Sequence, residues 1–315
     1  MSTKIETYIN KIPVIRVLMR FAKNIKLPLL EGISLYELIE MYTIGIIDGA
    51  ISYRAAAISF SFFMALFPFA LFILNLIPYI PIQGFQQDFL QFVAESVPPN
   101  TYDAIANIIN DILNNSQTGL LSSGFLLSIF LQANGLNAVL GGFETSKQIE
   151  IRRGFFRQYF VALGMSLLLN FILIATVAII VTFEIFLQKT KIQDVLSDRI
   201  PLLVLGRYAS VIFMILITVS ILFKFGIKRD KNRKFISIGS VFTTVLIIIS
   251  SYFFGIWVVK FSKYNELYGS IGTLLIMMFY IWINCMVLLL GFELDATINK
   301  HKKALNKQKM NILKD

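Results

Sequence analysis

The sequence predicts an all-α polytopic membrane protein with six transmembrane helices, amphipathic N-terminal helices and a two-helix outer loop. Of its 315 residues, 56% are hydrophobic and only 15% are charged, whereas soluble domains have roughly 45–50% apolar and about 25% charged residues. The mean hydropathy is correspondingly high, at +0.71. The apolar residues gather in six stretches, each long enough to cross ~30 Å of hydrocarbon as a helix of roughly 20 residues.

The N-terminal region, residues 1–55, is expected to lie on the cytoplasmic surface of the membrane. In residues 1–30, apolar side chains are interleaved with Lys and Arg, a pattern typical of amphipathic helices that bind anionic lipid surfaces. Ser34 and Glu37 have the spacing of a capping box. In this motif the side chain of each residue accepts a hydrogen bond from the backbone N–H of the other. A further helix should therefore begin at Ser34 and continue to about residue 47.

The transmembrane domain is predicted over residues 56–298. Pro68 lies inside its first span and should kink that helix, because proline leaves a backbone carbonyl without its usual donor. The third span is long, which predicts tilt or protrusion beyond the membrane. The six spans are expected at about residues 56–80, 120–143, 159–187, 202–225, 235–259 and 270–292.

The largest connection, residues 81–119, is expected to form the two-helix outer loop. Two apolar stripes at helical spacing lie on either side of Pro98 and Pro99, which predicts two short amphipathic helices. Such a pair would form either a lid packed on the outer mouth of the bundle or a gate or partner-docking surface.

The distribution of Lys and Arg predicts the orientation of the chain. Counted in order, residues 1–55, 144–158 and 226–234 and the segment after Phe292 hold 7, 4, 5 and 6 of them, whereas the three intervening connections hold 0, 3 and 2. Because basic connections face the cytoplasm, we expect both termini there, with residues 299–315 forming a basic tail. This tail lacks the interleaved aromatic residues that stack on bases, so we expect no nucleic-acid partner.

Several stretches resemble the YihY/BrkB family of bacterial inner-membrane proteins, the virulence factor BrkB family formerly labelled ribonuclease BN. The resemblance covers about residues 34–298, although residues 144–147 depart from the family pattern. It implies a six-helix α bundle in the inner membrane with both termini in the cytoplasm. The resemblance implies two possible activities. One is transport or movement of envelope lipids, and the other is the ribonuclease activity of the old label. The matching motifs are Arg54-Ala55-Ala56-Ala57 running to Pro68, Tyr264, Tyr268-Gly269-Ser270-Ile271-Gly272 and Gly291-Phe292-Glu293-Leu294-Asp295-Ala296.

The residues themselves argue against catalysis. A metal-dependent nuclease needs His, Asp and Glu clustered around its ions, but the single histidine, His301, lies in the Lys-rich tail. A serine nucleophile within a span would need a His base, and no predicted span contains one. We therefore predict that the protein is not an enzyme and has no cofactor and no metal site.

Amides within the spans are the candidate substrate pathway. Gln132, Asn134 and Asn137 interrupt the second apolar stretch, and Asn284 lies midway along the sixth as a natural partner. An amide in lipid without a partner is costly, so these groups must face protein or water. They therefore either join helices by hydrogen bonds or line a wet pathway. Asn170, isolated in the third span, is more simply explained as a helix–helix contact.

Charged residues at the cytoplasmic face form a second candidate group. Arg54 enters the first span, where it either anchors the helix at the interface or pairs with an acid. Glu293 and Asp295 end the sixth span on the same side. We expect them to pair with Arg54 or with the loop residues Arg152 and Arg153, which would fix the bundle, or to bind a cationic lipid headgroup.

The leading functional hypothesis is a transporter or flippase-like protein. It would move a lipid or other amphiphile across the inner membrane through a groove lined by the second span, with membrane lipids as its partners. The alternative is a scaffold for envelope assembly that transports nothing, and ribonuclease activity is the third possibility. A closed, dry interior favours the scaffold, whereas a cavity lined by the second span favours transport.

Overall fold

A computed structural model of the chain describes residues 34, 36, 40, 50–76, 118–146, 149, 153–189, 199–227, 233–260 and 270–312. This part of the chain is all-α, and it contains six helices that are long and apolar enough to cross a membrane. The predicted all-α fold with six spans is therefore confirmed. The amphipathic N-terminal helices, almost all of the outer loop and Arg152 lie outside the described residues.

The six helices follow the predicted spans closely. They are α4 (Ile51–Leu76), α7 (Thr118–Glu144), α8 (Phe155–Lys189), α9 (Arg199–Phe225), α10 (Ile238–Lys260) and α12 (Ser270–Ile312). The largest difference is in α12, which does not end with its apolar span at Phe292. Residues 293–312 contain no Gly or Pro and many good helix formers, so nothing in the sequence ends the helix there.

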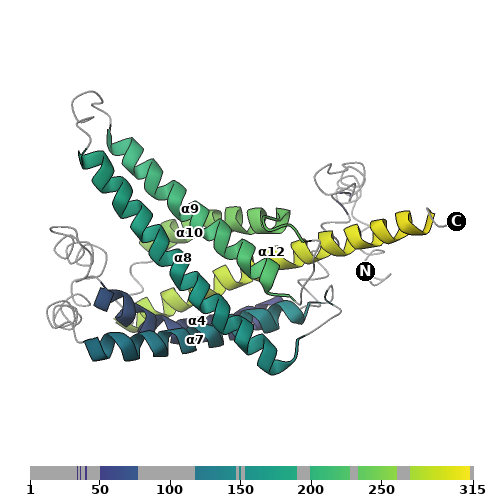
Figure 1. The fold of residues 1–315 in the computed structure, drawn as a ribbon, viewed down its shortest axis with the longest axis horizontal. Coiled ribbons are helices and arrows are strands. Elements are labelled where there is room, and N and C mark those ends of the chain that lie inside the picture. Colours follow the sequence, from purple (N-terminus) through teal and green to yellow (C-terminus); the bar gives the residue numbers. More distant parts are fainter. Residues whose placement is uncertain are drawn as a thin grey trace.

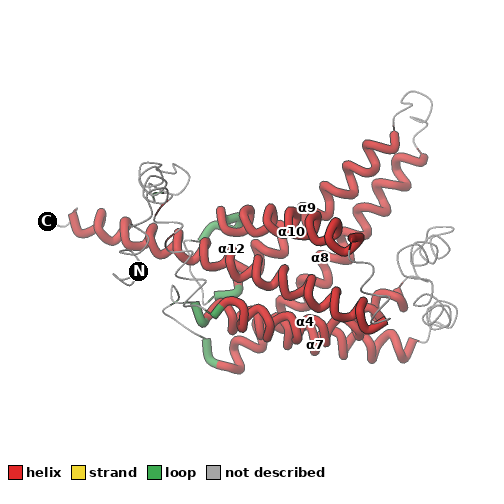
Figure 2. The backbone as a smooth tube through the Cα atoms, turned by 180° about the vertical axis from the view of Figure 1, so that it is seen from behind, coloured by secondary structure: helices red, strands yellow, loops and turns green. Residues whose placement is uncertain are grey.

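The six helices are arranged in a ring. Each packs on the next one along the chain, and α12 packs back on α4, so that the last helix closes the ring on the first. Figures 1 and 2 show α4, α7, α10 and α12 running roughly side by side, whereas α8 and α9 cross them obliquely and project beyond them at one end. α12 and α4 are far apart in the sequence, and the connection between α4 and α7, residues 77–117, is the longest between successive helices.

Small residues let α10 and α12 approach closely. A Cβ atom added at Gly291 would collide with the side chain of Thr243, and one added at Gly239 would collide with Asp295. Close contact through small residues is a common way of packing helices in a membrane. The outward faces carry exposed apolar side chains such as Phe160, Phe171 and Phe253, which suits a surface in contact with lipid.

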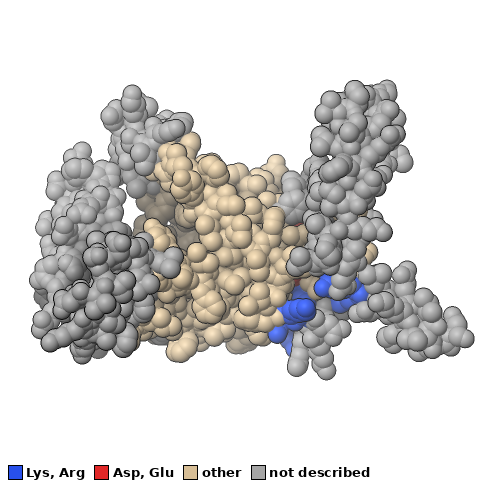
Figure 3. Space-filling view, turned by 90° about the horizontal axis from the view of Figure 1, so that it is seen from above, with Lys and Arg blue, Asp and Glu red and all other residues tan. Residues whose placement is uncertain are grey.

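Basic residues gather at one end of the bundle. In the space-filling view, the Lys and Arg side chains of the described residues appear near the end from which the C-terminal part of α12 projects (Figure 3). The rest of the visible described surface is uncharged. We call this the charged end.

Candidate functional site

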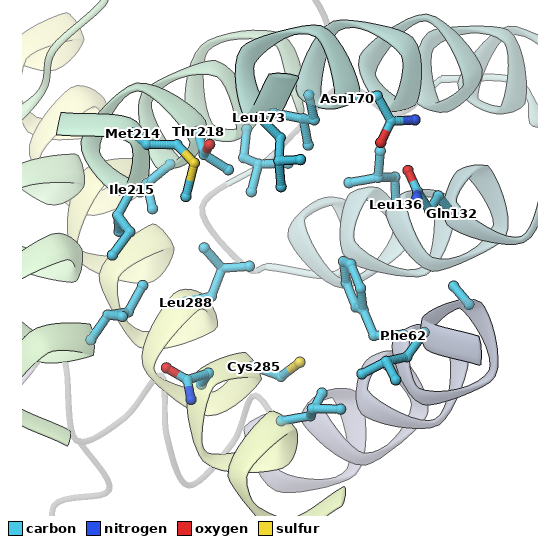
Figure 4. Close-up of a pocket in the computed structure, with 18 of the residues that line it drawn as sticks. Phe62, Gln132, Leu136, Asn170, Leu173, Met214, Ile215, Thr218, Cys285 and Leu288 are labelled. Atoms are coloured by element: carbon cyan, nitrogen blue, oxygen red, sulfur yellow. The ribbon is translucent and has the colours of Figure 1, made fainter. Parts of the chain in front are cut away.

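A cavity of about 510 Å³ that is partly open to the outside lies among the six helices, and all six contribute residues to its lining (Figure 4). This volume falls within the roughly 300–1,000 Å³ that is usual for ligand pockets. The walls are mainly apolar, and none of the described lining residues is Asp, Glu, Lys or Arg. Apolar lining residues include Phe62, Leu136, Leu173, Met214, Ile215 and Leu288.

A few polar side chains interrupt the apolar walls. Gln132 on α7 and Asn170 on α8 lie next to each other on one side of the cavity (Figure 4). Ser166, one turn before Asn170, donates from Oγ to Gln132 Oε1 at 3.2 Å. Asn284 on α12 also lines the cavity and donates from Nδ2 to the carbonyl of Tyr280 in its own helix at 2.9 Å.

Among the described polar residues that line the cavity, Asn170 has a buried side-chain nitrogen without a partner. Its side chain is only 7% exposed, and its Nδ2 has no hydrogen-bond partner. A buried donor without an acceptor costs roughly 1–3 kcal/mol. Asn170 Nδ2 therefore makes no helix–helix hydrogen bond in the described conformation.

The cavity brings together two of the four residues predicted for a substrate pathway, Gln132 and Asn284. Asn134 and Asn137 lie on the same helix as Gln132 but are not among the lining residues. The carbonyl of Asn137 accepts a hydrogen bond from Gln158 Nε2 at 3.1 Å, which ties α7 to α8. A transport role for all four residues stays a prediction, and the structure adds Asn170, whose only signal in the sequence was an amide in an apolar run.

Three buried phenylalanines lie between the cavity and the charged end. Phe143 and Phe292 stack with 4.0 Å between ring centroids, and Phe223 meets them edge-on at 5.8 and 5.6 Å. On α7 and α12, these rings follow the cavity residues Leu136 and Leu288 by one or two turns. The three rings, which we call the Phe layer, close the interior in the direction of the charged end.

Glu293 connects three helices immediately beyond the Phe layer. Arg54 Nη1 on α4 lies 3.2 Å from Glu293 Oε1, and the two side chains are 12% and 8% exposed. Ser146, just after α7, donates from Oγ to Glu293 Oε2 at 2.7 Å. Arg54 also donates to the carbonyl of Gly142 on α7. Of the partners expected for Glu293, the structure therefore supplies Arg54.

Asp295 has a different partner, which the sequence did not indicate. Its Oδ2 lies 3.0 Å from Nη1 of Arg233, and the two side chains are 3% and 6% exposed. Arg233 also donates to the carbonyl of Phe223, and its guanidinium lies 5.9 Å from the centroid of the Phe292 ring. In the sequence, Arg233 is one basic residue among several in its loop, so the only available signal was the need of a buried carboxylate for a cation.

Arg153 binds the end of α9 rather than either of the two acids. Its guanidinium donates to the carbonyls of Phe225 at 2.7 Å, Gly226 at 3.0 Å and Ile227. Phe225 is the last residue of α9, where carbonyls lack donors within the helix, and Gly226 and Ile227 follow it directly. Burial lowers the pKa of the Arg153 guanidinium below its ordinary value, while nearby Glu144 acts in the opposite direction. The backbone N–H of Arg153 in turn donates to Glu144 Oε1 at 3.1 Å.

These contacts divide the interior into three levels along the bundle. The cavity lies in the middle, the Phe layer follows, and the ion pairs of Glu293 and Asp295 lie at the charged end. Among the residues that the structure describes, no three His, Cys, Asp or Glu side chains gather where they could hold a metal ion.

Comparison with known proteins identifies the family. Residues 46–312 match the model of the virulence factor BrkB family. A putative ribonuclease-like protein YfkH of Bacillus subtilis (strain 168) is 27% identical over 257 residues, which are 79% of this chain and 90% of the relative. A UPF0761 membrane protein of Coxiella burnetii (strain RSA 493 / Nine Mile phase I) is 23% identical over 253 residues, which are 78% of this chain and 87% of the relative.

A further UPF0761 membrane protein, from Kangiella koreensis, is 23% identical over 266 residues, which are 80% of this chain and 63% of the relative. No solved structure matches the chain. The motifs that suggested the resemblance contribute the ion pair between Arg54 and Glu293. With a family match over residues 46–312 and six helices able to span a membrane, the chain belongs to the virulence factor BrkB family and is an integral, multi-pass membrane protein.

Proposed function

We propose that this protein moves a lipid or other amphiphile across the bacterial inner membrane, using the cavity inside the helix ring. The observation that carries the proposal is this cavity of about 510 Å³, lined by all six helices and mainly apolar with a few amides. An amphiphile has the same division into apolar and polar parts. Its binding would bury apolar surface at roughly 25 cal/mol per Å² while the amides fix its orientation.

The cavity favours transport over the alternative of a scaffold that moves nothing. Helices that packed directly on one another would gain dispersion contacts that the walls of this cavity lack, so the cavity lowers stability while it is empty. An unpartnered donor such as Asn170 Nδ2 lowers it further. A purely structural bundle gains nothing from the space, whereas a protein that binds a ligand between its helices needs it.

The Phe layer and the ion pairs give the proposed cycle a closed side. In the described conformation, a molecule in the cavity has the rings of Phe143, Phe223 and Phe292 between it and the charged end. Movement across the membrane therefore requires these rings and the Arg54–Glu293 pair to separate. Alternating access in transporters commonly proceeds by such rearrangement of helices around a central site.

We propose further that the charged end faces the cytoplasm. The connections rich in Lys and Arg alternate with connections that are poor in them, and basic connections are retained on the cytoplasmic side. In this orientation the cavity is closed toward the cytoplasm in the described conformation.

Reconstitution tests this function. Purified protein in liposomes should accelerate the movement of fluorescent lipids between leaflets, measured by quenching with a reductant that acts only on the outer leaflet. Gln132→Leu, which replaces an amide of the cavity wall, should slow the movement at least several-fold. Asn134→Leu, the same kind of change on the same helix away from the cavity, should retain the wild-type rate.

Two results would contradict the proposal. Wild-type protein that moves no lipid from a panel of charged and uncharged headgroups would leave the scaffold as the better explanation. A rate that falls in Asn134→Leu and not in Gln132→Leu would place the route along the polar face of α7 rather than through the cavity. Both variants must elute as monodisperse protein for the comparison to count.

A further inference from the structure

We propose that the outward face of α8 binds an anionic phospholipid, with the lipid phosphate at Arg157 and an acyl chain along an apolar stripe that begins at Phe156. The inference is independent of the proposed function, because it concerns the outside of the helix ring and not the cavity. It assigns a partner to an exposed face that the proposed transport route does not use.

The apolar stripe runs along one side of α8. Phe156, Phe160, Leu167 and Phe171 recur at helical spacing, so their side chains share a face of the helix. All four are between 44% and 78% exposed. Leu173, which lines the cavity, lies on the other side of the helix. The stripe therefore faces away from the ring, where hydrocarbon chains are its natural contacts.

Gly164 leaves a gap in the stripe. It lies four positions after Phe160 and three before Leu167, so it belongs to the same face. The residue is exposed, and a Cβ atom added there would meet nothing within 4 Å. Large side chains on both sides of a missing one offer a hydrocarbon chain dispersion contacts from three directions.

Arg157 supplies a positive charge at the foot of the stripe. It is exposed, and among the described residues no carboxylate forms an ion pair with it. The first turn of α8, in which it lies, contains no acidic residue. Arg153, one turn earlier, uses its guanidinium to bind the end of α9. Arg157 is therefore available to a phosphate, which a guanidinium binds in a bidentate manner.

The charge and the stripe have the relative positions of a headgroup and a chain. Lys and Arg gather at the charged end (Figure 3), and the apolar part of α8 begins there, at Phe155. From Phe156 to Phe171 the helix rises about 22 Å, enough to cross the ~15 Å hydrocarbon depth of one leaflet when tilted. Basic sites beside transmembrane helices on the cytoplasmic side are known to bind anionic headgroups.

The same charge disfavours a second copy of the chain as the occupant. Two copies in one membrane have the same orientation, so a two-fold axis between them runs along the membrane normal. Pairing through the stripe would place the two Arg157 guanidinium groups at the same level, where they repel each other. An anionic lipid instead brings the opposite charge to this position.

Photo-crosslinking in lipid nanodiscs tests the inference. The probes are a phosphatidylglycerol and a phosphatidylcholine with the same diazirine in the same acyl chain, so only the headgroups differ. Phosphatidylglycerol should label α8 between Phe160 and Phe171 several-fold more than phosphatidylcholine does. Both probes should label the exposed face of α4 around Phe60 equally, because the nearby Arg54 is already paired with Glu293.

Substitutions of Arg157 test the role of the charge. Arg157→Gln should remove the preference of α8 for phosphatidylglycerol, whereas Arg157→Lys, which keeps the charge, should retain most of it. Lys303→Gln is the matched control, because it removes a positive charge from an exposed position of α12 at the same end, and it should label as the wild type does. Added salt should lower the preference, since exposed charges are screened.

Filling the gap tests the role of the stripe. Gly164→Leu should reduce labelling of α8 by phosphatidylglycerol several-fold, because its side chain occupies the place of the acyl chain. Gly255→Leu on α10 adds the same side chain at another exposed glycine whose Cβ would meet nothing within 4 Å, and it should leave labelling of α8 unchanged.

Four results would overturn the inference. Equal labelling of α8 by the two probes in the wild type, or an unchanged preference in Arg157→Gln, would remove the lipid phosphate from the site. Loss of the preference in excess glycerophosphoglycerol, which has the phosphate but no chains, would make it a site for soluble anions. A wild-type dimer that Gly164→Leu converts to a monomer would make a second copy the occupant. The comparison of probes in the wild type decides even where a variant does not fold.

Discussion

Arg54 on α4 and Glu293 on α12 lie 239 positions apart in sequence, yet their Nη1 and Oε1 atoms are 3.2 Å apart in the folded protein. The two side chains are largely buried, so each charge depends on the other for compensation. The pair fixes the first described transmembrane helix against the last. The ring therefore depends on a contact between its two ends as well as on the contacts between successive helices.

Breaking this pair on one side should destabilise the protein severely. Arg54→Met or Glu293→Met alone leaves a buried charge without a partner, at a cost of about 3–5 kcal/mol. The double variant removes both charges and should recover most of the loss. Melting temperatures in detergent, followed by tryptophan fluorescence, measure the three variants. If the double variant instead lost as much melting temperature as the two single variants together, the two residues would not interact.

Arg153→Lys should be nearly as damaging as Arg153→Ala. The guanidinium of Arg153 donates to three successive carbonyls at the end of α9, and a lysine ammonium lacks the planar fork needed for this arrangement. We expect each substitution to cost about 1–3 kcal/mol of unfolding free energy. Arg157→Lys, at an exposed position at the start of α8, is the matched control and should melt as the wild type does. Full stability of Arg153→Lys would argue that charge alone suffices.

Gly291→Ala should disrupt the crossing of α10 and α12. The added methyl group would collide with Thr243, whose Cβ would be only 2.9 Å away, and such overpacking costs roughly 1–3 kcal/mol. Gly255→Ala on α10 is the control, because its Cβ would meet nothing within 4 Å and alanine favours a helix by up to about 1 kcal/mol. Detergent melting should separate the two clearly. Equal stability of both variants would mean that the helices move apart at little cost.

Cysteine labelling should establish the orientation. In a Cys285→Ala background, Asn100→Cys in the expected outer loop should react with a membrane-impermeant maleimide in intact cells. Lys303→Cys, at an exposed position beyond the ion pairs on α12, should react only after the membrane is permeabilised. The alternation of Lys and Arg among the connections is the physical reason. Labelling of Lys303→Cys in intact cells would reverse the assignment.

The six spans were predictable because membrane insertion is a local property of about 20 apolar residues. The pairing of Arg54 with Glu293 was among the expected alternatives, since both sit at span ends on one side. The pairing of Asp295 with Arg233 was not predictable, because several basic residues of that loop were equivalent in sequence. Glu144 belonged to a stretch that departs from the family pattern, yet it is 5% exposed and accepts the N–H of Arg153.

The cavity was predictable only in part, because its composition depends on how each helix is rotated about its axis. Gln132 and Asn284 were predicted because they are amides in apolar spans, and both line the cavity. Asn134 and Asn137 had the same signal, yet neither lies on its wall. The third span is apolar on every side, and such a helix does not reveal which face points inward. The place of Asn170 therefore needed the three-dimensional structure.

Closure of the ring by α12 has a consequence for biosynthesis. At roughly 5–20 residues per second, a ribosome needs on the order of 10–50 s to make the 239 residues from Arg54 to Glu293. During that interval the nascent protein is an open arc of helices with an uncompensated arginine and an interior exposed to lipid. The ring therefore cannot close before Glu293 is made, so a product truncated before this residue should be a preferred substrate of membrane proteases. Pulse–chase lifetimes of chains ending before and after that residue would measure the difference.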